Sequence, residues 1–163
     1  MKSKPLKSQQ SKFKSELEAK TAKQLNDDCV TYIYEGFRLN YTKPETDHYY
    51  KADFPVKKSA ALLSELEKID LLPEDYRYLD YVFLECKGGP NPRQHNPGLD
   101  VATRKKMLLV KDQHPGIDIR FVFENPDLKL RKGSKRTYAS WAEEHGFKWC
   151  GPKIPKEWFK DMN

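Results

Sequence analysis

The chain has 163 residues, of which 37% are hydrophobic and 33% charged, so its length predicts one domain with a hydrophobic core. Its formal charge of +6 and pI of about 9.1 favour an acidic partner, nucleic acid first, although a ribosomal or membrane-surface protein would share that charge. No apolar run approaches the roughly 20 residues of a membrane-spanning helix, and the lysine-rich N-terminus lacks the apolar stretch of a signal peptide.

The first predicted elements are a basic arm and a helix. Residues 1–12 interleave lysines with serine and glutamine and cannot bury a core, so they are predicted to form a mobile basic arm. From about Ser11 to Asn26 the apolar spacing is helical and gives the helix one leucine-bearing face. Glu18 lies on the flank of that face and is expected to point into the domain, whereas Glu16 should face solvent.

Extended segments follow this helix. Val30–Tyr34 and Phe37–Tyr41 alternate and are rich in β-branched and aromatic residues, which predicts two strands or one bent strand. A polar connector that contains Pro44 comes next. Tyr49–Phe54 then returns to an extended pattern, with Asp53 near its end.

A helix and a strand are predicted in the middle of the chain. Between residues 57 and 79, Ser59 is a candidate N-cap for a leucine-rich helix that Pro73 stops. The apolar run Tyr81–Lys87 is predicted to be a strand. The proline- and glycine-rich residues 88–98 are predicted to be a long loop.

The C-terminal half also alternates helix and strand. We expect a helix from Asp100 to about Gln113, a strand over residues 117–123, and a last helix near residues 137–145. A strongly basic loop over residues 125–136 separates the last two. Strands interleaved with helices predict an α/β or α+β domain with a mixed sheet.

Glu85, Cys86 and Lys87 stand at the end of the apolar predicted strand. Because side chains alternate along a strand, Glu85 and Lys87 point the same way, and an ordinary ion pair would explain them. A nuclease site would also explain them, because Asp53 ends another extended segment and two carboxylates on neighbouring strands can bind one Mg²⁺ ion. A lysine beside them can contact a scissile phosphate or an attacking water, and Glu18 could reach a second ion. The spacing alone favours the ion pair.

Basic side chains are the candidates for contacts with nucleic-acid phosphates. They lie near the N-terminus, on the helix after Asp100, and in the basic loop, and their ordinary alternative is a solvated surface. The candidates are Lys12, Lys14, Arg104, Lys105, Lys106, Lys129, Arg131, Lys132, Lys135 and Arg136.

Many short motifs occur in an order shared with one known family. They include Phe13-Lys14-Ser15-Glu16-Leu17-Glu18, Asp53-Phe54, Glu85-Cys86-Lys87-Gly88, Arg104-Lys105-Lys106, Gln113-His114-Pro115, Asp118-Ile119-Arg120, Lys132-Gly133-Ser134 and Glu157-Trp158. With these motifs the chain resembles phage endonuclease I, the Holliday-junction resolvase family of T-odd podophages. The matches cover most of the chain and are far more specific than two acids and a lysine.

The resemblance implies a restriction-endonuclease-like core of the PD-(D/E)xK superfamily, with flanking helices. It also implies a Mg²⁺-dependent endonuclease that binds four-way and other branched DNA by shape and nicks opposing strands, with Mn²⁺ able to substitute. By position, Asp53 and Glu85 would bind one ion together with the backbone carbonyl of Cys86. Glu18 and Asp53 would hold a second ion, and Lys87 would assist at the phosphate or the nucleophile.

The resemblance further implies an intertwined homodimer in which Glu18 reaches the site from the partner chain. Residues 13–163 would then form a single nuclease domain, with 43–48 as the bridge between exchanged halves and 57–79 and 89–103 as insertions. The expected location is the cytoplasm of the infected bacterial host, without a membrane partner. Two alternatives stay open, namely a branched-DNA binding protein without catalysis and a nuclease of the same superfamily acting on linear DNA.

Overall fold

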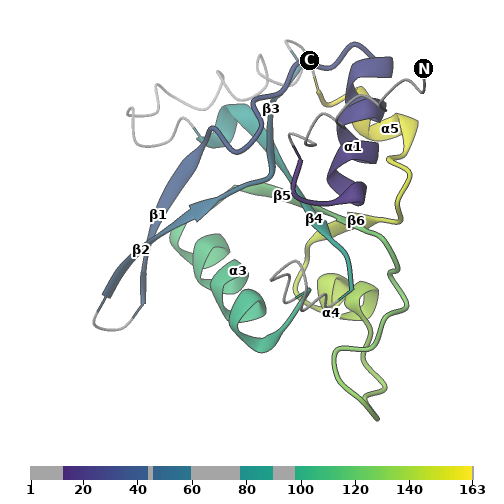
Figure 1. Cartoon of the computed structure of the whole chain (residues 1–163). Helices are drawn as coiled ribbons and strands as arrows, with labels where there is room; N and C mark the ends of the chain where they lie inside the picture. Colours follow the sequence, from purple (N-terminus) through teal and green to yellow (C-terminus); the bar gives the residue numbers. More distant parts are fainter. Residues whose placement is uncertain (1–12, 44–45, 60–77, 90–97, 163) are drawn as a thin grey trace, which may run out of the picture.

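The computed structural model describes residues 13–43, 46–59, 78–89 and 98–162. Its centre is a mixed sheet with helices on both faces, and a two-stranded hairpin extends to one side (Figure 1). The predicted α+β class with a mixed sheet is confirmed. No helix in the described ranges is long and apolar enough to cross a membrane.

The first helix, α1, spans Glu16–Asp27 and agrees with the predicted one to within a few residues at its start. Leu17 and Leu25 recur at helical spacing and are buried against the sheet. Glu18 is buried beside them, and Glu16 is exposed, as the helical spacing predicted.

Strands β1 (Arg38–Lys43) and β2 (Thr46–Lys51) form the antiparallel hairpin. Leu39, Tyr41 and Tyr50 point from it into the hydrophobic core. Lys43 pairs with Thr46 on either side of the predicted connector around Pro44, so the two extended segments that flank the connector are neighbours in space.

The strand predicted over Val30–Tyr34 is wrong. This segment contributes a single β-bridge, between Tyr32 and Val56, and no strand of its own. Positive φ angles of 56° at Cys29 and 51° at Glu35 turn the backbone at both ends of the segment, which leaves no room for a longer ladder.

The central sheet has the strand order β3-β4-β5-β6. Strand β3 (Phe54–Lys57) runs antiparallel to β4 (Tyr81–Lys87), while β4, β5 (Asp118–Phe123) and β6 (Lys148–Cys150) are parallel to one another. The bounds of β4 are those predicted. Strands β4 and β5 lie in the middle and are buried on both faces, which explains their nearly continuous apolar sequences.

Two of the remaining helices were predicted and one was not. Helix α3 (Val101–Gln113) begins after the N-cap Asp100, and α4 (Tyr138–Glu144) is the predicted last helix of the C-terminal half. The short helix α5 (Lys156–Phe159) and strand β6 had no clear periodic signal in the sequence.

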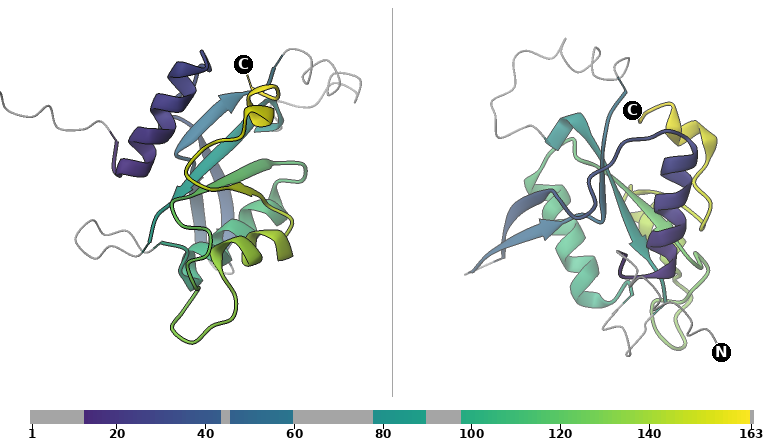
Figure 2. Two further views of the ribbon diagram at one scale, coloured as in Figure 1. Left: turned by 90° about the vertical axis from the view of Figure 1, so that its right-hand side faces the viewer. Right: turned by 45° about the horizontal axis from the view of Figure 1, so that its top comes forward.

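Each face of the central sheet has its own hydrophobic core. Helix α1 packs over one face, where Phe54 and Leu84 are fully buried. Helices α3 and α4 cover the other face, around Phe83, Phe121 and Trp141. Figure 2 shows α1 and α3 on opposite sides of the strands. Because both faces are covered, polar chemistry is confined to the two ends of the sheet.

Several predicted segments lie outside the part of the chain that the structure describes. The basic arm over residues 1–12, most of the helix between residues 57 and 79, and most of the loop over residues 88–98 lie outside the described residues. The single nuclease domain over 13–163, the bridge over 43–48, the insertions over 57–79 and 89–103, and the exchanged homodimer all stay predictions.

Candidate active site

The end of β4 brings three of the predicted site residues together. Asp53 directly precedes β3, and the pairing of Phe54 with Leu84 places Asp53 across from Glu85 at the end of the antiparallel ladder. Glu85 and Lys87 are two residues apart on β4 and therefore share a face of the sheet. The fold thus converts two distant sequence segments into one polar cluster.

Glu85 is almost completely buried, with 2% of its surface exposed. Its Oε1 lies 2.7 Å from Lys87 Nζ, so the ion pair suggested by the sequence is present. Its Oε2 accepts a hydrogen bond of 2.7 Å from the hydroxyl of Tyr50. Both carboxylate oxygens are therefore held in place by the protein alone.

Asp53 gives the cluster its unusual electrostatics. Its Oδ2 accepts a hydrogen bond of 2.9 Å from the backbone N–H of Cys86. Burial, and then the negative charge of Glu85, raise the pKa of Asp53 to about 8, although Lys87 acts in the opposite direction. The two carboxylates thus share one lysine, and a bound cation would favour the ionised form of Asp53 over the protonated form.

Lys87 keeps its positive charge in this setting. Burial alone would lower the pKa of Lys87, but the carboxylates of Glu85 and Asp53 outweigh burial and raise it. About one seventh of the side chain (15%) remains exposed. A charged ammonium that is partly open to solvent can contact a phosphate oxygen of a substrate.

Helix α1 brings Glu18 to the edge of the same cluster. Its carboxylate accepts hydrogen bonds from the backbone N–H of Lys14 at 2.9 Å, the hydroxyl of Ser15 at 3.1 Å and the hydroxyl of Tyr34 at 2.5 Å. The charge of Glu18 contributes to the raised pKa of Asp53, so the two carboxylates interact within one chain. These donors hold Glu18 in one orientation.

Cys86 points away from Glu85 and Lys87. Its thiol is buried and donates a hydrogen bond of 3.4 Å to the hydroxyl oxygen of Thr21, which ties β4 to α1. Its backbone N–H holds Asp53. The role predicted for Cys86 as a metal ligand depends on its backbone carbonyl, which a side-chain substitution would not remove.

The donor set suits Mg²⁺ in its chemistry. Asp53 and Glu85 offer hard carboxylate oxygens, and Mg²⁺ is commonly held by one or two carboxylates, with substrate phosphate and water completing its coordination. Within the described ranges, no three His, Cys, Asp or Glu side chains lie close enough together to hold an ion. The residues therefore fit an ion shared with a substrate, and not one enclosed by side chains alone.

Tyr50 is a site residue that the sequence analysis missed. It lies on β2 with 1% of its surface exposed, and Lys106 Nζ of α3 is 5.7 Å from the centre of its ring. Burial, and then the charge of Glu85, raise the pKa of Tyr50 well above its ordinary value, so its hydroxyl remains a donor. No spacing in the sequence reveals this contact, because it depends on how the hairpin packs against β4.

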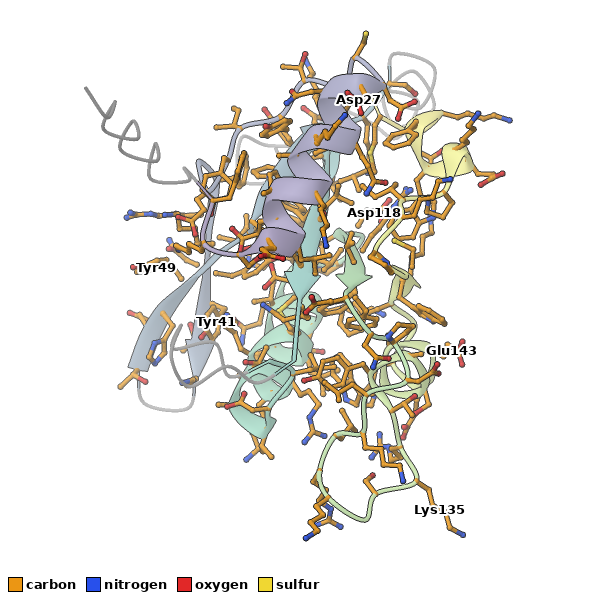
Figure 3. All side chains as sticks on the ribbon, turned by 45° about the vertical axis from the view of Figure 1, so that its right-hand side comes forward. Asp27, Tyr41, Tyr49, Asp118, Lys135 and Glu143 are labelled. Atoms are coloured by element: carbon orange, nitrogen blue, oxygen red, sulfur yellow. The ribbon has the colours of Figure 1, made fainter. Side chains whose placement is uncertain are left out.

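The candidate phosphate contacts fall into two groups. Lys14 and Lys106 lie near the acidic cluster, because the charge of Asp53 contributes to the raised pKa of Lys14, and Lys106 reaches the ring of Tyr50. The basic loop lies at a distance, and Figure 3 shows Lys135 near its tip. The exposed residues of this loop are Lys129, Arg131, Lys132, Lys135 and Arg136, while Arg104 is half-buried, Lys105 is exposed, and Lys12 lies outside the described residues.

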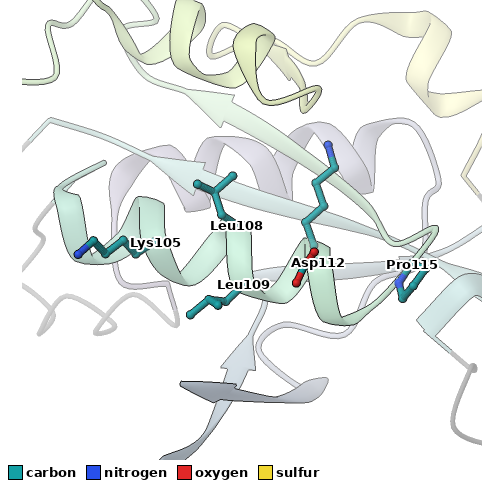
Figure 4. Close-up of a pocket in the computed structure, with 6 residues that line it drawn as sticks. Lys105, Leu108, Leu109, Asp112 and Pro115 are labelled. Atoms are coloured by element: carbon teal, nitrogen blue, oxygen red, sulfur yellow. The ribbon is translucent and has the colours of Figure 1, made fainter. Parts of the chain in front are cut away.

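A separate hollow of about 770 Å³ lies along α3 (Figure 4). Its lining residues are Lys105, Leu108, Leu109, Lys111, Asp112 and Pro115. This lining contains a single carboxylate and is apolar in its middle, so it lacks the paired acids that the chemistry needs. The end of β4 is the better candidate for catalysis.

Two carboxylates and a charged lysine at the carboxyl end of a sheet strand can bind a metal ion and a phosphate together, as phosphodiester hydrolysis requires. The fold and the site together suit the class of α+β nucleases.

Comparison with known proteins identifies the family. A model of the phage endonuclease I family matches residues 2–65 and 93–163. The chain is 34% identical over 149 residues to Endonuclease I of Escherichia phage T7, a match that covers 91% of this chain and 79% of the relative. It is 36% identical over 143 residues to Endodeoxyribonuclease 1 of Enterobacteria phage T3, a match that covers 88% of this chain and 74% of the relative. The chain belongs to the phage endonuclease I family, as its motifs indicated, and it is a nuclease.

The family match covers the site residues unequally. The matched ranges contain Glu18 and Asp53 but leave out residues 66–92, and therefore Glu85 and Lys87. The placement of Glu85 and Lys87 beside Asp53 rests on the structure instead. Their catalytic roles stay predictions.

Proposed function

We propose that this nuclease is a Mg²⁺-dependent, structure-selective DNA endonuclease that resolves four-way and other branched junctions by nicking opposing strands. The observation that carries the proposal is the pairing of the partly buried Asp53 with the buried Glu85 beside one lysine, where burial and the charge of Glu85 raise the pKa of Asp53 to about 8. The name of the relative from phage T3 states cleavage of DNA. The site of action would be the cytoplasm of the infected host.

The proposed roles follow from the contacts at the end of β4. Asp53, Glu85 and the carbonyl of Cys86 would hold one Mg²⁺, and Glu18 with Asp53 would hold a second, with Mn²⁺ able to substitute. The bound metal would neutralise the substrate phosphate and lower the pKa of the attacking water. Lys87 contacts the phosphate or orients that water, since its ammonium is charged and partly exposed.

The positive charge of the chain supports a DNA substrate. The chain has an excess of six positive charges, and Lys105 of α3 and the exposed lysines and arginines of the basic loop can contact backbone phosphates. Binding that depends on such contacts weakens as salt rises, because counterions are released from the DNA. Several separate basic segments suit a branched substrate, whose arms diverge.

Cleavage of a synthetic four-way junction tests the proposed activity. With Mg²⁺ present, Glu85→Ala and Lys87→Ala should each lower the nicking rate at least about 100-fold, because the first removes a proposed metal ligand and the second removes the cation proposed to act at the phosphate or the water. The exposed Glu16→Ala and Lys57→Ala are matched controls that should leave the rate unchanged. Full activity in the Glu85→Ala and Lys87→Ala variants would refute the assignment.

The same assay separates the two alternative functions. A protein that binds the junction but does not nick it, with either Mg²⁺ or Mn²⁺, would be a branched-DNA binding protein. Equal cleavage of linear duplex and junction in direct competition would indicate a nuclease without preference for branches.

We also propose that the functional unit is a homodimer with exchanged halves. In the hairpin, Arg38 pairs with Lys51 and Lys43 pairs with Thr46, so the pairing is symmetric about the turn. If residues 43–48 were extended, residues 38–51 of one chain could pair with the same residues of a second copy. Each strand residue would then keep the partner residue it has in the hairpin, now supplied by the other chain. Opening the turn therefore conserves the ladder, and α1 with Glu18 moves to the partner.

Mixing two inactive chains tests the exchange. Glu18→Ala and Asp53→Ala chains, refolded together, should regain nicking activity because an exchanged heterodimer contains one site with both carboxylates intact. Sites formed within single chains would regain none. A monomeric mass by light scattering would also contradict the proposed dimer.

A further inference from the structure

The opposite end of the central sheet holds a second polar pocket. A cavity of about 490 Å³ opens where β5 and β6 begin. It lies far along the sheet from the active site, because β4 and β5 pair Val82 with Asp118 at this end and Lys87 with Phe123 at the other. The charged residues that line it are Lys58, Lys111, Asp118, Arg120, Lys148 and Asp161.

We propose that this pocket binds a phosphate-type oxyanion, either free inorganic phosphate or a phosphate of a DNA backbone. Four cationic side chains face two carboxylates, which leaves an excess of two positive charges. Both carboxylates are already bound by one cation. Nε and Nη2 of Arg120 donate to Asp118 at 2.9 and 2.6 Å, and Nη2 also lies 2.8 Å from Asp161.

Arg120 provides the most specific indication of a ligand. It is 1% exposed, and its Nη1 has no hydrogen-bond partner among the described residues. The ring of Trp158 lies 5.3 Å from the guanidinium carbon and covers part of the group. A buried donor without an acceptor is destabilising, and an oxyanion would supply the missing acceptor to a group whose planar geometry suits phosphate.

Lys58 adds a second buried cation to the same pocket. It is 5% exposed, and its Nζ donates a hydrogen bond of 2.6 Å to the carbonyl of Leu79. An ammonium has three donors, so this carbonyl leaves capacity for an anion. Burial lowers the pKa of Lys58, and the charge of Arg120 adds to that effect although Asp118 opposes it. Two neighbouring buried cations are stabilised when an anion lies between them.

The shape and lining of the pocket restrict the class of ligand. Apart from the two engaged carboxylates, its charged groups can only donate hydrogen bonds, so the ligand must be rich in acceptors. The cavity volume exceeds that of one phosphate and leaves room for water or for the sugar beside a backbone phosphate. Lys148 lines the pocket and is exposed, so it can meet an incoming anion.

Calorimetric titration with inorganic phosphate tests the pocket without metal, in EDTA and at constant ionic strength. Lys58→Met removes the buried charge but keeps an unbranched side chain, and Lys148→Ala removes an exposed charge at little risk to folding. Lys57→Met is the control, because Lys57 is the neighbouring residue but is exposed and does not line the pocket. Phosphate affinity should fall at least about tenfold in Lys58→Met and Lys148→Ala and stay unchanged in the control.

Three results would overturn the proposal. They are no phosphate binding by the wild type, unchanged affinity in both pocket variants, and an equal loss in Lys57→Met.

A parallel titration with linear duplex identifies the source of the phosphate. If Lys148→Ala weakens duplex and phosphate binding together, the pocket takes backbone phosphate, whereas loss of phosphate binding alone assigns it to the free ion. Because EDTA prevents Mg²⁺-dependent cleavage, these results do not depend on the proposed nuclease activity.

Discussion

Two aspartates at opposite ends of the central sheet have opposite shifts in pKa. Burial and the charge of Glu85 raise the pKa of Asp53 to about 8. Burial acts in the same direction on Asp118, but the hydrogen bonds and charge of Arg120 outweigh it and lower the pKa of Asp118. Both aspartates are partly buried beside the same strands, so the difference comes from their partners.

This difference separates a structural charge from a functional one. At the start of β5, the guanidinium of Arg120 compensates Asp118 and Asp161, and the carboxylates there stabilise the fold. At the end of β4, Asp53 and Glu85 share Lys87 and remain under-compensated. Carboxylates with incomplete compensation cost stability once they ionise, and the proposed cation, bound together with substrate, would offset that cost.

Protein stability should be most sensitive to loss of the Asp118 carboxylate at the start of β5. Asp118→Asn should lower the free energy of unfolding at pH 7 by about 1.5–3 kcal/mol, because it removes the negative charge and one of the two oxygens that accept hydrogen bonds from the buried Arg120. Since the folded state lowers the pKa of Asp118, this stability is present above the ordinary aspartate range and is lost as pH falls through the folded pKa. Urea unfolding at several pH values measures it.

Asp112→Asn is the control for that experiment, because Asp112 is exposed on α3. It should change stability by no more than about 0.5 kcal/mol at any pH. If Asp118→Asn were equally silent at pH 7, the contrast between compensated and uncompensated carboxylates would fail.

Loss of the Asp53 carboxylate, at the other end of the sheet, should change the free energy of unfolding in the opposite direction. Asp53→Asn should raise the free energy of unfolding in EDTA at pH 8 by about 2 kcal/mol, since one pKa unit corresponds to about 1.4 kcal/mol and the neighbouring charges relax in part. The folded state raises the pKa of Asp53 from 3.8 to about 8, so it binds a proton that the unfolded chain has lost. Wild-type stability therefore falls as pH rises between these values, and the gain from Asp53→Asn should vanish near pH 4.

Metal addition sharpens the same experiment. If Asp53 is a ligand, Mg²⁺ should raise the unfolding temperature of the wild type and have a much smaller effect on Asp53→Asn. A variant that is less stable than the wild type in EDTA at pH 8 would contradict the raised pKa and with it the proposed electrostatic strain.

The sequence predicted those parts of the fold whose signals are local. Helix α3 lies between the cap Asp100 and Pro115, and β4 is an unbroken apolar run, so both could be located from neighbouring residues. Strand β6 has three residues and exists because β5 offers it a parallel edge, which no local pattern encodes. The segment Val30–Tyr34 has a strand-like composition but is interrupted by backbone turns at its ends.

The two polar sites could likewise be predicted only where their signals are local in the sequence. Alternation along β4 was sufficient to place Glu85 and Lys87 on one face. Alternation along β5 would put Arg120 in solvent, yet the strand is central and both its faces are covered, so Arg120 is buried and needs carboxylate partners. The contact of Tyr50 with Glu85 depends on the packing of the hairpin and could not be predicted either.

The contact of Tyr50 with Glu85 gives the smallest expected effect and the finest test of the acidic end. Tyr50→Phe removes the hydroxyl that donates to Glu85 Oε2 and keeps the buried ring. One lost hydrogen bond to a carboxylate should lower kcat for junction nicking about tenfold, equivalent to about 1.4 kcal/mol, with KM nearly unchanged because the hydroxyl holds Glu85 and not DNA.

Tyr49→Phe is the matched control, because Tyr49 is the adjacent residue on the same strand but is 56% exposed. It should leave kcat within about twofold of the wild type, as expected for an exposed residue remote from the chemistry. A change in KM with kcat unaltered in Tyr50→Phe, or an equal decrease in kcat in both variants, would show that Tyr50 acts through general packing. A decrease in kcat confined to Tyr50→Phe would show that Glu85 must be held by its hydrogen bond as well as by its ion pair with Lys87, and the Tyr50 hydroxyl provides that hold without adding a charge that would compete with a bound cation.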